Sequence, residues 1–198
     1  MWVLVSRHSS PPWLAMVTLG VAAITAATGS FHTTMYDHYK NVFLQMTTPH
    51  YREAEDYASA LARYRQRHAE RTSVLVRLAW PVYLFYVKSQ EDYVVKFDPF
   101  TPRALGQLPP YREASARIYE ELAGPAMRIW RGWFGFGSLV FGIALASFLD
   151  VLELYMLARL LLQNAVFYGH LRPRQREASR EAFARIARLE PTGTATPV

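Results

Sequence analysis

The 198-residue sequence contains no cysteine. This absence excludes a disulfide framework, a thiolate nucleophile, and zinc or iron–sulfur sites held by cysteine. Charged residues are also few, at 19%, whereas 51% of the residues are hydrophobic. The charges sum to +6, which suits anionic partners such as lipid headgroups, RNA or acidic protein surfaces. The chain is too short for a large multidomain enzyme, so the distribution of its apolar residues is the informative feature.

Motifs that identify a reaction are missing as well. The six histidines form neither a His-Glu-x-x-His pair nor a Glu-x-x-His repeat, so we predict no metal site. Gly135-Phe-Gly137 fails the dinucleotide fingerprint, because Val140 stands where the third glycine is required. No phosphate-binding loop and no Gly-x-Ser-x-Gly elbow occur. We therefore predict no catalytic residue and no cofactor, apart from a structural anionic phospholipid such as cardiolipin.

An uncharged run predicts a first transmembrane helix over 13–31, after an N-terminal segment 1–12. A helix of this length extends about 28 Å, close to the hydrocarbon thickness of a bilayer. Trp13 and Phe31 stand where interfacial aromatic residues are expected. The alternative is a cleaved secretory signal, because Arg7 precedes the run and the small residues Ala27 and Gly29 could mark a cleavage site.

A second and stronger transmembrane helix is predicted over 133–152. Trp130 and Trp133, with Arg128 and Arg131, are interpreted as an interfacial belt before it.

The apolar pattern continues into a helix extension, 153–171. From Trp133 to Tyr168 one helix would measure about 54 Å, which is too long for a single untilted crossing. The chain must therefore leave the membrane, break or turn back.

Asp150 and Glu153 are the predicted membrane boundary, because carboxylates are costly at mid-bilayer; a proton relay is the alternative role. Beyond them, Arg159, Gln163 and Asn164 do not share one narrow helical stripe, which indicates packing on several sides.

Small residues recur at every fourth position in both predicted spans, which would let helix backbones approach closely. Chance in Ala-rich and Gly-rich helices is the alternative. The predicted packing residues are Thr18, Ala22, Ala26 and Ser30 in the first span and Ser138, Gly142 and Ala146 in the second.

A shorter apolar segment, 73–87, contains Arg77 and Pro81, so a buried or membrane-surface segment is favoured over a third crossing. The next segment, 88–110, contains Tyr93-Val-Val-Lys-Phe97 followed by four prolines, and it is predicted to be an extended connector.

The polar segments predict amphipathic soluble helices. In the helical region 32–72, Thr48 and Pro49 are expected to begin a helix that runs to Arg71. The pre-membrane segment 111–132 is expected to be a helix interrupted at Gly124-Pro125. The C-terminal segment, 172–198, is predicted to be a basic amphipathic helix followed by a tail.

Two groups of arginines are candidate ligands for anionic lipid headgroups. Each arginine near a charged membrane surface would contribute on the order of 1 kcal/mol to membrane binding. They are Arg63, Arg67 and Arg71 in the first group and Arg172, Arg174 and Arg176 in the second. A solvated or salt-bridged helix face is the alternative. Nucleic acid is not an expected partner, because no platform of aromatic residues that could stack on nucleobases accompanies these arginines.

The sequence thus predicts a mainly α-helical integral membrane protein with two transmembrane helices. We expect a non-catalytic accessory subunit of an energy-transducing complex, an ATP synthase or a respiratory-chain complex, in the mitochondrial inner membrane. Its expected partners are other membrane subunits and anionic lipids. One alternative is an independent membrane enzyme or transporter acting on lipid, with His32, Asp37 and His38 as its chemical group. Another is a membrane-shaping or tethering protein.

Overall fold

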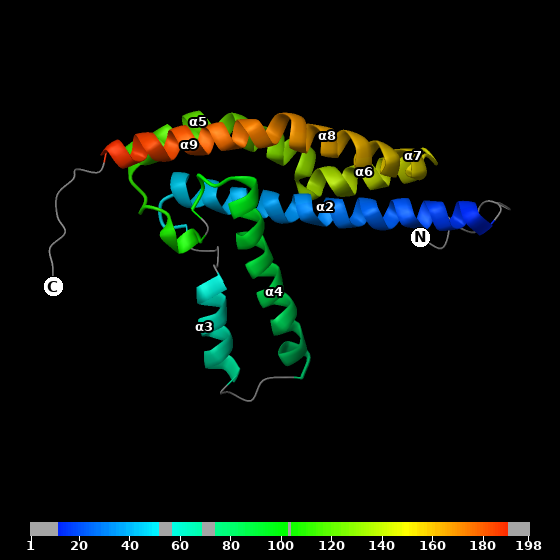
Figure 1. Ribbon diagram of the computed structural model, residues 1–198, viewed down its shortest axis with the longest axis horizontal. Helices are drawn as coiled ribbons and strands as arrows, with labels where there is room; N and C mark the ends of the chain where they lie inside the picture. Colours follow the sequence, from blue (N-terminus) through cyan, green and yellow to red (C-terminus); the bar gives the residue numbers. More distant parts are fainter. Residues whose placement is uncertain (1–11, 52–56, 69–73, 103, 190–198) are drawn as a thin grey trace. The chain divides into compact units, whose positions relative to one another are not determined.

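The computed structural model describes residues 12–51, 57–68, 74–102 and 104–189. Within these ranges it is 88% helical and contains no strand, so the mainly α-helical fold is confirmed (Figure 1). The chain divides into two compact units. Unit 1 comprises Met1–Tyr36 and Arg128–Pro173, and unit 2 comprises Asp37–Met127 and Arg174–Val198.

In the described ranges most elements are α-helices, and they are joined by one short 3-10 helix (η1) and two π-helical turns (η2 and η3). In chain order they are α2 (Pro12–Thr47), α3 (Tyr57–His68), α4 (Val74–Phe97), η1 (Leu105–Gln107), α5 (Glu113–Phe134), α6 (Phe136–Phe148), α7 (Leu152–Ala158), η2 (Arg159–Gln163), α8 (Asn164–Val166), η3 (Phe167–Leu171) and α9 (Arg172–Leu189). Helices α2, α5 and α9 each contribute residues to both units.

The hydrophobic core of unit 2 is built from pairs of residues four positions apart. Such pairs lie on one face of a helix, because an α-helix repeats every 3.6 residues. Leu105 and Leu108, at η1, complete the cluster. The three helical pairs are Val42 and Met46 of α2, Tyr119 and Ala123 of α5, and Ala182 and Ile186 of α9. The apolar face predicted for the C-terminal helix therefore packs into a core at Ala182 and Ile186, whereas Leu189 is exposed.

A buried polar network lies beside this core. The carboxylate of Asp98, which is fully buried, accepts hydrogen bonds from Tyr39 Oη at 3.3 Å and Thr101 Oγ1 at 2.7 Å. The backbone N–H of Phe100 also donates to it, at 3.0 Å. Thr101 Oγ1 lies 2.9 Å from Ser179 Oγ of α9. Asp98 thus joins the end of α4 to α2 and α9.

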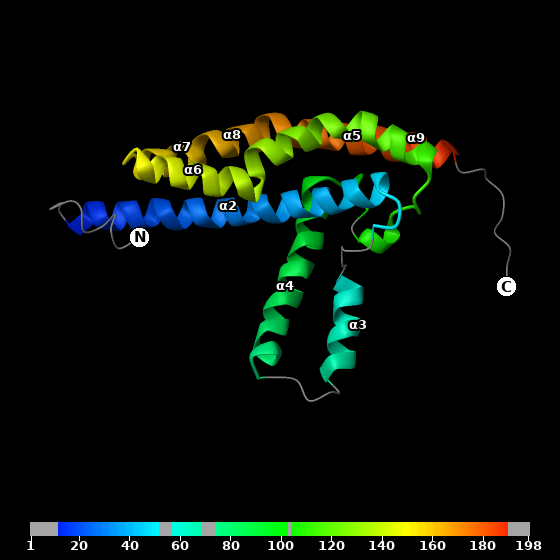
Figure 2. The ribbon, with the colours of Figure 1, turned by 180° about the vertical axis from the view of Figure 1, so that it is seen from behind.

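Helices α3 and α4 lie side by side and contact each other through Tyr64 and Trp80, whose ring centroids are 5.8 Å apart (Figures 1 and 2). The segment 73–87 is part of α4 from Val74 onward, and Pro81 lies inside this helix. The prediction of an extended connector over 88–110 is wrong for 88–97, which is helical. Val87, Val94 and Phe97 are buried at helical spacing, and this burial outweighs the strand propensity of the segment.

Two further predictions about helix ends are wrong. Thr48–His50 form the turn that ends α2 rather than the start of the next helix, and His50 has a φ of 63°. Residues 52–56, which would carry the first turns of that helix, lie outside the described residues. Helix α5 continues through Gly124-Pro125, because a proline inside a helix can kink it without ending it.

In unit 1, α6 and the following helical arm form a hairpin, defined here as residues 136–171. Leu149–Val151 make the turn, where Asp150 has a φ of 61°. Tyr155 of α7 then packs back against Gly142 of α6. Of the three outcomes expected for the long apolar stretch, the structure shows that the chain turns back. Helix α6 is about 20 Å long and the second arm roughly 30 Å.

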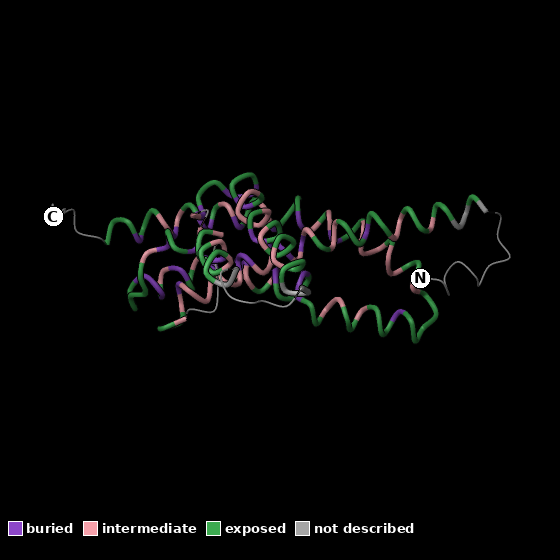
Figure 3. The backbone as a smooth tube through the Cα atoms, turned by 90° about the horizontal axis from the view of Figure 1, so that it is seen from below, coloured by how far each residue is buried: buried purple, intermediate pink, exposed green. Residues whose placement is uncertain are grey.

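One stretch of the described residues, Glu113–Phe148, is long and apolar enough to cross a membrane by length and composition. Only 22% of its most apolar 18-residue window is buried inside the chain. Residues 13–31 are helical within α2, and exposed residues predominate along this part of α2 (Figure 3). Among the described residues, 13–31 does not meet the same criterion of length and composition, so its insertion stays a prediction.

The predictions for the N-terminal segment before Pro12 and for the tail after Leu189 lie outside the described residues.

Candidate functional site

An aromatic cluster holds the base of the hairpin in unit 1. It consists of Phe31, His32, Trp130, Phe134 and Phe167. The His32 ring lies 4.3 Å from that of Phe167 and 5.1 Å from that of Phe134, measured between centroids. Trp130 is fully buried in this cluster, so its predicted place in an interfacial belt is wrong. Trp133, in contrast, is exposed.

His32 and His38 are not brought together as a reactive pair. Six residues along one helix separate them by about 120° around its axis. Both are buried, and burial lowers the pKa of His38 to about 4. Asp37 is held by Lys40 Nζ at 3.5 Å and accepts a hydrogen bond from Tyr86 Oη at 3.5 Å. The chemical group of the lipid-enzyme hypothesis is therefore dispersed over different faces of α2.

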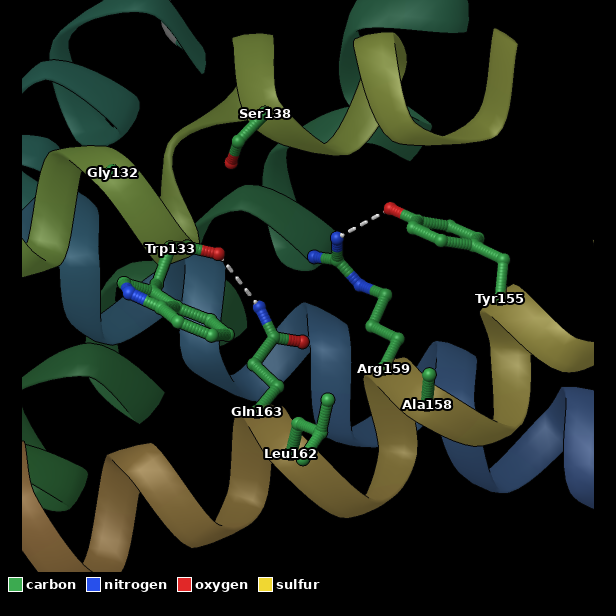
Figure 4. Close-up of a pocket in the computed structure, with 8 residues that line it drawn as sticks. All are labelled: Gly132, Trp133, Ser138, Tyr155, Ala158, Arg159, Leu162 and Gln163. Atoms are coloured by element: carbon green, nitrogen blue, oxygen red, sulfur yellow. Dashed lines mark hydrogen bonds between the residues drawn. The ribbon is translucent and has the colours of Figure 1, made fainter. Parts of the chain in front are cut away.

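A pocket of about 300 Å³ opens inside the hairpin (Figure 4). Its walls come from the end of α5, from α6, and from α7 and η2. The lining residues are Gly132, Trp133, Ser138, Tyr155, Ala158, Arg159, Leu162 and Gln163. Among these described residues there is one cation and no carboxylate.

The polar side chains of the second arm that line the pocket are spaced four residues apart. Tyr155, Arg159 and Gln163 follow one another along α7 and η2, so they lie on one stripe of the arm. Arg159 and Gln163 bound a π-helical turn, a distortion that occurs frequently at functional sites. Asn164 lies about 100° further around the helix and does not line the pocket, so Arg159, Gln163 and Asn164 do not share one stripe, as predicted. Asn164 instead donates to the carbonyl of Leu160 at 2.6 Å.

Hydrogen bonds fix the polar groups of the pocket. Arg159 Nη1 donates to Tyr155 Oη at 3.0 Å, and Gln163 Nε2 donates to the carbonyl of Trp133 at 3.0 Å (Figure 4). The hydroxyl of Ser138 donates to the carbonyl of Gly135 at 2.7 Å. The guanidinium of Arg159 has five N–H donors, and the phenol of Tyr155 accepts a hydrogen bond from Nη1 alone. Because Arg159 lines the pocket, its other N–H groups can serve as donors to a molecule bound there.

The predicted packing residues of α6 all face the interior of the hairpin. Ala146 is buried, and Ser138 and Gly142 are half-buried. A Cβ at Gly142 would lie 2.7 Å from Tyr155 Cε2, so only glycine fits without displacing that ring.

The small residues predicted for packing in the first span lie in α2, and only some of them are on the buried side of this helix. Thr18 and Ala22 are half-buried, but Ala26 and Ser30 are exposed. Each step of four residues rotates the position by about 40° around the helix axis, so the later small residues lie progressively further from the side that contains the buried Thr25.

Among the described residues, none of the arginines predicted to bind lipid lines the pocket. Arg63 is exposed on α3, the side chain of Arg67 is not described, and Arg71 lies outside the described residues. On α9, Arg172 is half-buried and Arg174 is exposed. Arg176 has a structural role instead, because it donates to the carbonyls of Phe97 at 2.5 Å and Lys96 at 3.2 Å at the end of α4.

Asp150 and Glu153 lie at and just after the turn of the hairpin, and both are exposed. The predicted boundary thus coincides with the hairpin tip. No group of three His, Asp or Glu side chains that could hold a metal ion occurs in the part of the chain that the structure describes.

Neither the pocket nor the Asp98 network was predicted from the sequence. A usable signal for the pocket was the polar residue at every fourth position of an apolar run. No protein family model, curated protein or solved structure matches this chain.

Proposed function

We propose that the chain is a non-catalytic, membrane-embedded structural subunit of a larger complex. The supporting observation is that both arms of the hairpin expose large apolar side chains. Phe148 at the end of α6 is 85% exposed, and Phe141 and Leu154 are also exposed. Contiguous apolar surface is unfavourable in water, but in a bilayer it contacts acyl chains, and helices satisfy their own backbone polar groups there.

Unit 2 supports the assignment to a complex. Leu78, Val82 and Phe85 of α4 are exposed and lie at spacings of four and three residues, which places them on one face of the helix. An apolar stripe of this kind is the usual contact surface of a helix that docks against another protein. In this proposal the hairpin anchors the chain in lipid, and α4 contacts a neighbouring subunit.

The finer proposal is a subunit of an ATP synthase or respiratory-chain complex of the mitochondrial inner membrane. It rests on the sequence: a small cysteine-free chain, apolar helices with Arg-rich polar segments, and no catalytic motif.

Extraction of the native membranes tests the proposal. After a carbonate wash the chain should stay in the membrane pellet, and in mild detergent it should migrate with a particle far larger than itself. Mass spectrometry of that particle would identify its neighbours. Recovery of the chain as a water-soluble monomer would contradict the proposal, and a small oligomer that modifies lipid unaided would favour the enzyme hypothesis.

A matched pair of variants separates the two surfaces. Phe141→Arg places a charge on the hairpin, and Phe85→Arg places the same charge on α4. The hairpin variant should be retained less in carbonate-washed membranes than wild type, because arginine at mid-bilayer costs about 2.5–3.5 kcal/mol. The α4 variant should stay in the membrane but separate from the large particle. Equal behaviour of the two variants would contradict this division.

A further inference from the structure

We propose that the Arg159 pocket binds the phosphodiester of an anionic phospholipid whose acyl chains lie along the hairpin. This inference rests on the proposed membrane location of unit 1. It assigns the lipid to a specific cavity rather than to the exposed arginine groups.

The charge balance of the pocket calls for an anion. Arg159 is half-buried between apolar helices, and its described hydrogen-bond partner is the neutral phenol of Tyr155. Cations within apolar membrane segments are costly unless an anion or a polar cavity compensates them. The lining residues supply no carboxylate. An anion from outside the chain would therefore complete the site.

The donors suit a phosphate. A guanidinium presents paired N–H groups whose spacing matches two oxygens of a phosphate, and such charge-assisted bonds are short and strong. The hydroxyls of Ser138 on α6 and Tyr155 on α7 also line the cavity (Figure 4). They donate to the carbonyls of Gly135 at 2.7 Å and Leu139 at 3.5 Å, and either hydroxyl can reorient toward a ligand.

The remaining walls suit a lipid rather than free phosphate. Trp133, Ala158 and Leu162 offer apolar surface beside the guanidinium, and the neighbouring Leu161 is exposed. Acyl chains would cover this surface. A free phosphate dianion would leave it uncovered and would meet only one cation.

Native mass spectrometry of the full-length, delipidated chain in detergent tests the site. The probes are dioleoyl phosphatidylglycerol, dioleoyl phosphatidylcholine and inorganic phosphate. Arg159→Gln should weaken binding of phosphatidylglycerol about tenfold, which corresponds to one charge-assisted contact. Arg174→Gln, which removes an exposed arginine, should change it less than about twofold. Arg159→Lys keeps the charge and should bind with intermediate strength.

Three results would overturn the site. One is equal binding of phosphatidylglycerol by the wild type and Arg159→Gln, with both showing the same helical circular dichroism. Another is displacement of the lipid by an equal concentration of inorganic phosphate, which would assign the pocket to the free ion. The third is a loss of neighbouring subunits in Arg159→Gln without a change in lipid binding, which would assign Arg159 to a partner's carboxylate.

Flotation with phosphatidylcholine vesicles separates this inference from the proposed function. If neither wild type nor Arg159→Gln floats, the membrane location itself fails. If both proteins float, and Arg159→Gln prefers phosphatidylglycerol over phosphatidylcholine as strongly as the wild type does, the membrane location holds and the lipid site fails.

Discussion

At the scale of single residues, Asp98 is the polar centre of unit 2. It is fully buried, and it accepts hydrogen bonds from Tyr39, Thr101 and the backbone of Phe100. Burial and the neighbouring Asp98 carboxylate raise the pKa of Tyr39 well above its usual range, so this phenol stays a donor at all physiological pH values. The network depends on a single carboxylate.

Replacing that carboxylate should destabilise unit 2. Asp98→Ala removes the acceptor for three donors and should lower the free energy of unfolding by about 3 kcal/mol. Asp98→Asn keeps one carbonyl oxygen and should lose less. Chemical denaturation followed by circular dichroism measures both variants. The exposed Glu120→Ala is the control, and a loss at position 98 no greater than that of the control would contradict a structural role for the network.

His38 makes stability depend on pH. Its pKa is about 4 in the folded chain and 6.5 in the unfolded chain, so unfolding binds a proton between these values. The stability it contributes is present above pH 6.5 and is lost as the pH falls toward 4, by up to about 1.4 kcal/mol per pH unit. His38→Gln should flatten this part of the stability profile.

Unfolding in denaturant at neutral and mildly acidic pH measures the effect. His170→Gln, at an exposed position, is the matched control. A profile equally steep in wild type and His38→Gln would show that His38 is protonated without unfolding.

At the scale of elements, the two arms of the hairpin approach closely at Gly142. Gly142→Ala would push the added methyl into Tyr155, displacing the ring that holds Arg159, and should destabilise the hairpin by about 1–3 kcal/mol. Gly137 lies on the same helix with open space around it. Gly137→Ala should therefore be neutral or stabilise by up to about 1 kcal/mol. Thermal unfolding in detergent compares the two, and similar losses at both positions would contradict close packing at Gly142.

Much of the helical content was predictable, but where the helices end was not. Composition and periodicity gave the helical class and a break near Asp150. The proline at position 125 misled the prediction, because it lies inside a helix that continues past it. Residues 93–97 have strand propensity, and only the burial of Val94 and Phe97 reveals the helix.

The candidate site was less predictable, because contacts between residues distant in sequence create it. Ser138 and Arg159 share a pocket only once the turn at Asp150 brings the arms together. Asp98 followed by Thr101 carries a local turn signal, but its partner Tyr39 is 59 residues away. Periodicity within a segment holds no information about such pairings.

At the scale of the whole molecule, the lack of cysteine makes membrane topology directly measurable. In a hairpin that spans the bilayer, both ends lie on one side and the turn on the other. Arg131→Cys and Pro173→Cys should therefore react with an impermeant maleimide from the same side of sealed vesicles. Asp150→Cys should react only from the opposite side. Reaction of all three positions from one side would show that the hairpin enters without crossing.

The turn at Asp150 also has a consequence for biogenesis. During synthesis, a spanning hairpin must carry its tip, with the exposed carboxylates of Asp150 and Glu153, through the hydrocarbon interior before they regain water. Asparagine also tolerates a φ of 61°, so Asp150→Asn preserves the turn while removing one charge from the translocated loop. The native carboxylate would raise the barrier to moving the loop through the hydrocarbon. It would slow insertion of the loop, and it would equally slow the return of the loop once it has reached the far side.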